Sequence, residues 1–93
     1  NPIYDFISSW CVRDPKGTIQ AKRCFTAYKL WCSDNGVDPI SFTAFGTWIK
    51  DMNFEKTDGR LIFYKGLALT PDAETRMIDI ETSQYRNRYE KED

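Results

Sequence analysis

Seven polar or basic side chains of this sequence have the chemistry to contact a phosphate backbone or the edges of bases. Thr43, Thr47 and Lys50 recur at helical spacing within residues 41–52. A lysine can reach a phosphate or a guanine edge, and a threonine can donate to a phosphate or touch a thymine methyl group. The free N–H groups at the start of such a helix, around Ser41, offer a further phosphate site.

The other three candidate contacts, Lys56, Arg60 and Arg23, lie outside that segment. Lys56 and Arg60 flank Thr57-Asp58-Gly59, and Asp-Gly is a strong signal for a hairpin turn. At the tip of a hairpin, both can contact a DNA backbone or the adjacent minor groove. Arg23, on an earlier predicted helix, can add phosphate neutralisation. Each of these charges can equally serve only to solvate the surface.

The segment 41–52 is predicted to be a helix capped by Ser41, with Phe42, Phe45, Ile49 and Met52 as its apolar face. Its opposite face carries small or polar residues that have nothing to bury. Strands over 54–56 and 60–64 are predicted to follow, with the second strand continuing to residue 69 and bending or bulging at Gly66.

Two further helices precede this unit. Residues 2–10 carry apolar side chains at i, i+3, i+4 and i+7, and the second helix is predicted from a Thr18 cap to about Ser33. Between them, residues 13–17 contain Pro15 and Gly17 and are predicted to form a turn. The predicted fold class is α+β, mostly α: a winged helix of three helices followed by a β-hairpin wing, with a polar C-terminal extension. A helix of this kind can enter a nucleic-acid groove.

Most aromatic residues lie at core spacing and are predicted to pack inside: Phe6, Trp10, Phe25, Tyr28, Trp31, Phe42 and Phe45. Trp48 lies to one side of the apolar stripe of residues 41–52. It can pack under the hairpin or stack against a partner. Because side chains alternate along a strand, either Phe63 or Tyr64 is predicted to face away from the core.

The charge of the chain is unevenly distributed, although its net value is −1. Residues 1–71 contain nine Lys or Arg against seven Asp or Glu, whereas residues 72–93 contain four against seven. We therefore predict a mildly basic winged-helix domain over 1–71 and an acidic tail over 72–93. The tail is open to three interpretations: a short strand over Met77–Ile80, a weak helix whose stripe is Ala73, Met77 and Ile80 with Gln84, or partial disorder.

The sequence gives no support for catalysis or for a bound cofactor. It contains no histidine, and its three cysteines cannot complete an ordinary zinc site without one. Cys24 and Cys32 lie on one predicted helix, about 12 Å apart, which is too far for a disulfide. We predict reduced thiols in a core, no metal, no cofactor and no enzymatic activity of this chain by itself. No apolar run has the length needed to span a bilayer, so no membrane partner is expected.

Several ordered motifs carry a resemblance to a known family: Cys24-Phe25-Thr26-Ala27-Tyr28-Lys29-Leu30-Trp31-Cys32, Asn35-Gly36, Pro39-Ile40-Ser41, Phe45-Gly46 and Tyr64-Lys65-Gly66-Leu67-Ala68-Leu69. Their order resembles the C-terminal domain of phage and plasmid primase–helicases, the large replication proteins of the satellite-phage and poxvirus type. The resemblance covers about residues 4–71. It implies a winged helix that follows a helicase core and, in some members, is associated with recognition of the replication origin.

Two functional hypotheses follow. In the first, a DNA-binding winged-helix module, weak in isolation, helps to place a primase–helicase on origin or template DNA. In the second, the winged helix docks a replication partner or a neighbouring subunit through Trp48, Leu30 and the hairpin. The expected partners are DNA and the parent helicase core or other replication proteins. The resemblance implies the cytoplasm of a bacterial host or phage-infected cell as the location.

Overall fold

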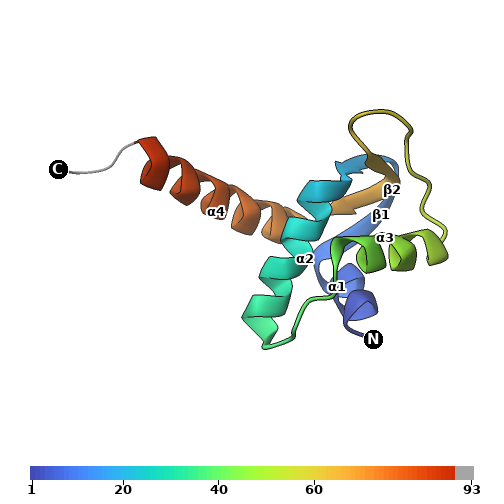
Figure 1. Ribbon diagram of the computed structural model, residues 1–93, viewed down its shortest axis with the longest axis horizontal. Coiled ribbons are helices and arrows are strands. Elements are labelled where there is room, and N and C mark those ends of the chain that lie inside the picture. The colour runs from blue at the N-terminus through green and yellow to red at the C-terminus, as the bar shows by residue number, and fades with distance from the viewer. Residues whose placement is uncertain (90–93) are drawn as a thin grey trace.

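A computed structural model describes residues 1–89 of the 93-residue chain (Figure 1). Its elements are α1 (Pro2–Trp10), β1 (Cys11–Gln20), α2 (Ala21–Asn35), α3 (Phe42–Asp51), β2 (Phe63–Leu69) and α4 (Pro71–Tyr89). The described chain is therefore α+β and mostly helical, with one two-stranded antiparallel sheet. This architecture is compatible with a winged-helix-like fold.

The sheet pairs β1 with β2, and the sequence did not predict β1. Cys11 pairs with Leu69 at one end and Gln20 with Phe63 at the other. Between these ends, residues 14–17 of β1 stand opposite Gly66, which adopts φ +81°, so the predicted irregularity at Gly66 is confirmed as a bulge. The prediction of a turn over 13–17 is wrong, because the chain does not reverse there and β1 runs through these residues. Its breaker residues are accommodated inside the bulge, and the strand continues on both sides.

Helix α2 begins at Ala21, so the prediction of a Thr18 cap is wrong. Thr18 pairs with Lys65 in the sheet, and its neighbour Ile19 is buried in β1. The first free N–H of α2 is satisfied by backbone instead: Ala21 donates to the Ile62 carbonyl at 2.8 Å. Strand pairing has thus overridden a local capping preference.

Helix α3 matches its prediction closely. The Ser41 hydroxyl accepts from the Ala44 N–H at 3.1 Å, and Phe45 and Ile49 are completely buried. Phe42 is the exception, because it is 42% exposed. Its ring packs on Phe25, with the ring centroids 5.3 Å apart, and Phe25 is itself only half-buried. Phe42 therefore covers the edge of the core, and its assignment to the core was wrong.

The connection from α3 to β2 is looser than the predicted hairpin. Lys56 forms an isolated bridge with Tyr64, and the Lys65 N–H donates to the Glu55 carbonyl at 2.8 Å. The predicted first strand is thus reduced to a short ladder, and the predicted second strand begins only at Phe63. One reason is local: the Thr57 hydroxyl accepts from the Phe63 N–H at 3.0 Å and closes a wide loop rather than a tight turn.

The core is one aromatic and aliphatic cluster that joins α1, α2 and α3 to one face of the sheet. Phe6 lies at its centre, and its ring approaches Tyr28, Trp31 and Phe45 with centroids 5.6–6.3 Å apart. Four of the aromatic residues predicted to pack inside are buried: Phe6, Tyr28, Trp31 and Phe45. Trp10 is half-buried, and Trp48, 37% exposed, makes an edge contact with Tyr4.

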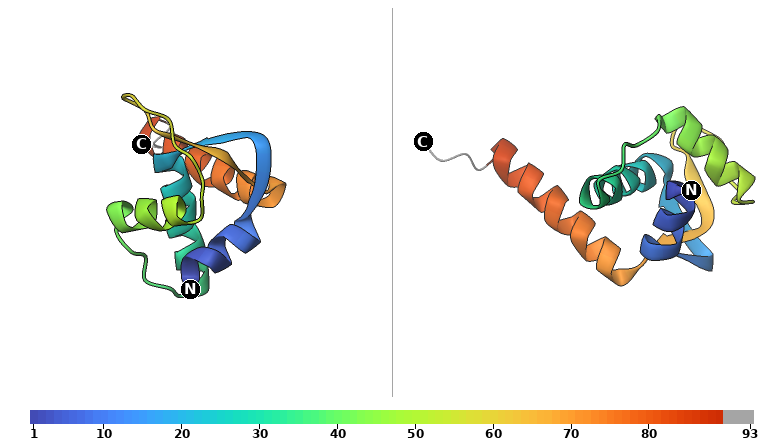
Figure 2. Two further views of the ribbon diagram at one scale, coloured as in Figure 1. Left: turned by 90° about the vertical axis from the view of Figure 1, so that its right-hand side faces the viewer. Right: turned by 90° about the horizontal axis from the view of Figure 1, so that it is seen from below.

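Residues 72–89 of the predicted tail belong to the long helix α4, so the helix interpretation is confirmed there and there is no strand over 77–80. Ala73 and Met77 are buried in the core, while the C-terminal part of α4 extends away from the body (Figures 1 and 2). The remaining tail, 90–93, lies outside the described residues. The domain boundary at residue 71 stays a prediction. Among the residues described, no helix combines the length and apolarity needed to cross a membrane.

Truncating Phe45 should strongly destabilise the fold, because its ring is fully buried against Phe6 and Tyr28. We expect Phe45→Ala to lower the free energy of unfolding by about 3–5 kcal/mol. Phe42→Ala, at the exposed edge of the same helix, should cost less than about 1 kcal/mol. Urea denaturation of both variants measures the difference, and equal losses would contradict the orientation of α3.

The buried thiols should make the fold alkali-sensitive. Burial raises the pKa of Cys11 from its ordinary value of 9.0 to about 12 and raises that of Cys24 as well. A thiol whose pKa is higher in the folded state than in the unfolded state stabilises the fold fully at pH values below the pKa of the unfolded state. This contribution to stability is lost as pH rises from about 9 toward about 12. We expect the urea midpoint to fall between about pH 8 and about pH 10.5, with a shallower fall in Cys11→Ala. A flat profile would contradict this assignment.

Candidate nucleic-acid interface

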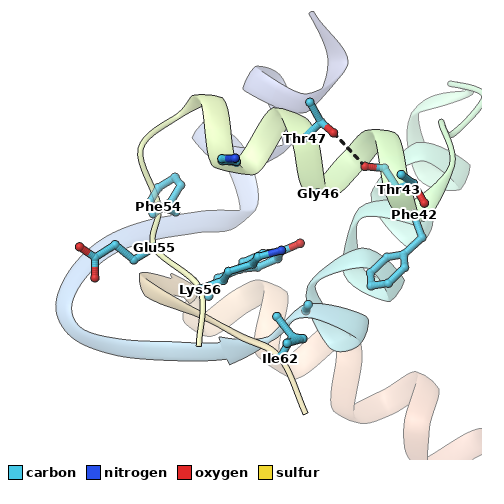
Figure 3. Close-up of a pocket in the computed structure, with 11 residues that line it drawn as sticks. Phe42, Thr43, Gly46, Thr47, Phe54, Glu55, Lys56 and Ile62 are labelled. Atoms are coloured by element: carbon cyan, nitrogen blue, oxygen red, sulfur yellow. Dashed lines mark hydrogen bonds between the residues drawn. The ribbon is translucent and has the colours of Figure 1, made fainter. Parts of the chain in front are cut away.

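An open groove of about 700 Å³ runs between α3 and the chain that leads into β2 (Figure 3). One side is the polar face of α3, with Thr43, Gly46, Thr47 and Lys50. The other side includes Lys56, and Ile62 and Tyr64 also contribute to the lining. The structure therefore brings together four of the seven predicted contacts: Thr43, Thr47, Lys50 and Lys56.

The basic side chains at and near the polar edge of this groove are accessible to a ligand. Lys50, Lys56 and the nearby loop residue Arg60 are exposed, and within residues 1–89 none of them takes part in an ion pair. The Thr47 hydroxyl donates to the Thr43 carbonyl at 3.2 Å, which fixes its rotamer along the helix (Figure 3). Glu55 is the one acidic residue in the lining, and it lies at the opposite end of the groove from Phe42 (Figure 3).

The apolar part of the groove was not predicted as part of a site. Phe42, Phe54 and Ile62 contribute to it, together with Tyr64, which is only 4% exposed. Burial raises the pKa of Tyr64 from its ordinary value of 10.0 to about 12. The alternation of side chains along the strand indicated that one of Phe63 and Tyr64 faces the core. The packing of β2 beneath α3 shows that this ring is Tyr64.

Three of the predicted contacts, Ser41, Arg60 and Arg23, do not line the groove. Ser41 lies at the start of α3, where its hydroxyl accepts the Ala44 N–H. Arg60 lies in the exposed loop between the Lys56 bridge and β2. Ser41 and Arg60 are exposed and can contact only a ligand that extends beyond the groove.

Arg23 does not line the groove, and its side chain is paired with α4 instead. Its guanidinium pairs with Glu74 and Glu81 of α4, and these two carboxylates raise its pKa. A second pair, Arg76 with Asp34, links α4 to the end of α2 at 3.1 Å. A contact between Arg23 and phosphate would require the Arg23 pairs to break.

No group of three or more His, Cys, Asp or Glu side chains within residues 1–89 is arranged to hold a metal ion. The three cysteines are unpaired and buried. The chemistry that the groove offers is therefore binding through hydroxyl groups, ammonium groups and apolar surface.

The chain is a small α+β domain with an open groove, and comparison with protein families identifies its family. Residues 1–88 match the model of the poxvirus D5 protein-like family, so the chain belongs to that family. It is a primase–helicase-related replication domain, and the resemblance stated from the sequence is confirmed. Searches of curated proteins and of solved structures each gave no significant match.

Removing the Arg23 guanidinium should loosen α4 from α2. We expect Arg23→Gln to lower the free energy of unfolding by about 0.5–1 kcal/mol, because the pair is partly exposed and screened by solvent. Lys22→Gln, an exposed neighbour, is the control and should have no effect. Urea denaturation at low salt measures both variants, and equal stability of Arg23→Gln and the unmodified chain would contradict a stabilising role for these pairs.

Proposed function

We propose that α3 and the loop that follows it form the DNA-binding surface of a winged-helix module, and that this module helps to place a primase–helicase on origin or template DNA. The observation that carries the proposal is the gathering of Thr43, Thr47, Lys50 and Lys56 around one groove, with both lysines exposed and without ion pairs among the described residues. Membership of a replication-protein family supports nucleic acid as the ligand.

In this proposal α3 is the recognition helix and residues 53–62 are the wing. The order helix, strand, helix, helix, strand and the antiparallel pairing of β1 with β2 agree with a winged helix. Lys50 and the threonines meet phosphates or base edges, Ser41 and the free N–H groups of α3 add a phosphate contact, and Arg60 reaches the backbone from the wing. The module is non-catalytic and depends on a larger enzyme for its activity.

A second candidate function is protein docking, and one surface favours it. Tyr4 and Trp48 form an exposed edge-to-face pair, with their ring centroids 6.1 Å apart, on the part of α3 that faces α1. Aromatic residues of this kind are enriched in protein interfaces. A replication partner or a neighbouring subunit could bind there, and hydrophobic binding of this kind would change little with salt.

Reversing single charges at the groove and wing tests the DNA-binding proposal. We expect Lys50→Glu and Arg60→Glu each to weaken DNA binding by about tenfold at low salt, with no change in thermal midpoint, because phosphate contacts dominate affinity. Lys16→Glu in the bulge of β1, an exposed lysine outside the groove, is the control. Fluorescence anisotropy with labelled DNA measures the affinities, and unchanged values in both variants would overturn this binding surface.

A further inference from the structure

The Tyr64 hydroxyl belongs to a mostly buried side chain, has no hydrogen-bond partner among the described residues and keeps some contact with solvent. The residue is 4% exposed, yet among residues 1–89 its hydroxyl makes no hydrogen bond. It is not completely sealed from solvent either, and it reaches toward α3, where it lies 3.6 Å from the position that a Cβ of residue 46 would occupy. Since Tyr64 lines the groove, this hydroxyl is available to a ligand that enters the groove.

The size and lining of the groove suit a flat, partly apolar group. Its volume of about 700 Å³ lies within the range of about 300–1,000 Å³ that is typical of small-molecule sites. Gly46 opens the α3 side because it has no side chain, and the rings of Phe42 and Phe54 supply aromatic surface. An aromatic ring with a hydrogen-bonding edge would satisfy both the apolar lining and the Tyr64 hydroxyl.

The two lysines of the groove favour a ligand whose aromatic ring is attached to anionic groups. Lys50 on α3 and Lys56 on the opposite side are both exposed and line the groove. A ring that enters between them brings its attached chain close to both ammonium groups, which favours a ligand with an anionic group on each side. A nucleotide within a nucleic-acid strand has this arrangement, because each base is flanked by two phosphates.

We propose that this groove holds one unstacked nucleobase of single-stranded DNA, with the Tyr64 hydroxyl bonded to the edge of the base and Lys50 and Lys56 bound to the flanking phosphates. The inference rests on the proposed DNA-binding function and adds the strand form of the ligand. A duplex keeps each base stacked between its neighbours and exposes only the base edges, so an intact base pair cannot enter the groove. Single strands present whole base faces to aromatic side chains.

Two variants separate the base site from general phosphate binding. Tyr64→Phe removes only the hydroxyl. Gly46→Ala adds a methyl group at an ordinary contact distance of 3.6 Å from that hydroxyl, so it occupies the groove without displacing α3. Alanine is also the better helix former, and Gly46→Ala should therefore raise the thermal midpoint while it weakens binding. Tyr4→Phe, an exposed tyrosine outside the groove, is the matched control.

The experiment measures fluorescence anisotropy of the full 93-residue chain with three labelled DNAs: a single strand, the duplex of that strand, and an abasic strand of equal length. We expect the single strand to bind tightest and the abasic strand to bind about tenfold more weakly. Tyr64→Phe should lose about threefold to tenfold on the single strand and nothing on the abasic strand. Gly46→Ala should bring the single strand down to the abasic affinity, and Tyr4→Phe should match the unmodified chain.

Other outcomes overturn the inference in distinguishable ways. Equal affinities for the abasic and ordinary strands, tighter binding of the duplex, or unchanged binding in Tyr64→Phe and Gly46→Ala would reject the base site and leave the DNA-binding proposal standing. If none of the three DNAs binds at tens of micromolar and low salt, both proposals fail. The groove would then be better explained as a site for a peptide of a partner protein.

Discussion

The antiparallel pairing of β1 with β2 is the constraint on which the rest of this structure depends. It joins residues 11–20, near the start of the chain, to residues 63–69, and every helix attaches to this pair or to the core beneath it. The register sets Ile19 opposite Tyr64 and Gln20 opposite Phe63. That register places the Tyr64 ring beneath α3. The chain from Met52 to Ile62, which connects the end of α3 to the start of β2, must therefore run back alongside the helix. The groove is the space that this return path leaves beside the polar face of α3.

The same arrangement assigns different roles to the basic residues of the chain. Arg23 lies where the start of α4 crosses α2, and it is neutralised by Glu74 and Glu81. Lys50 lies in α3 and Lys56 in the loop that follows it, and no carboxylate pairs with them within the described residues. A domain with a small net charge can thus still present unpaired lysines, because Glu74 and Glu81 of α4 pair with Arg23 and not with the lysines of the groove.

Local patterns predicted part of this structure well and failed where distant pairing decides. The Ser41 cap, the Phe45 and Ile49 stripe and the bulge at Gly66 are encoded within a few residues, and each is present. β1 was missed because Pro15 and Gly17 are typical of turns. Here they lie in a bulge of a strand, and only pairing with the distant strand β2 makes that possible. Helical spacing had placed Thr43, Thr47 and Lys50 on one face of the predicted helix, and the hairpin signal had singled out Lys56; all four line the groove. Tyr64 was not predicted as a contact, because the packing of β2 against α3, and not the sequence alternation, decides where its hydroxyl lies.

The central claim is that nucleic acid binds along α3 and the loop that follows it. Its most direct test is a titration of the isotope-labelled chain with single-stranded and duplex DNA, in which ¹H–¹⁵N chemical shifts report the contact surface residue by residue. The account predicts that the largest shift changes cluster at Thr43, Gly46, Thr47 and Lys56 and follow one saturable binding curve. Changes confined to α4, to the Tyr4 and Trp48 surface, or to no surface at all would contradict it.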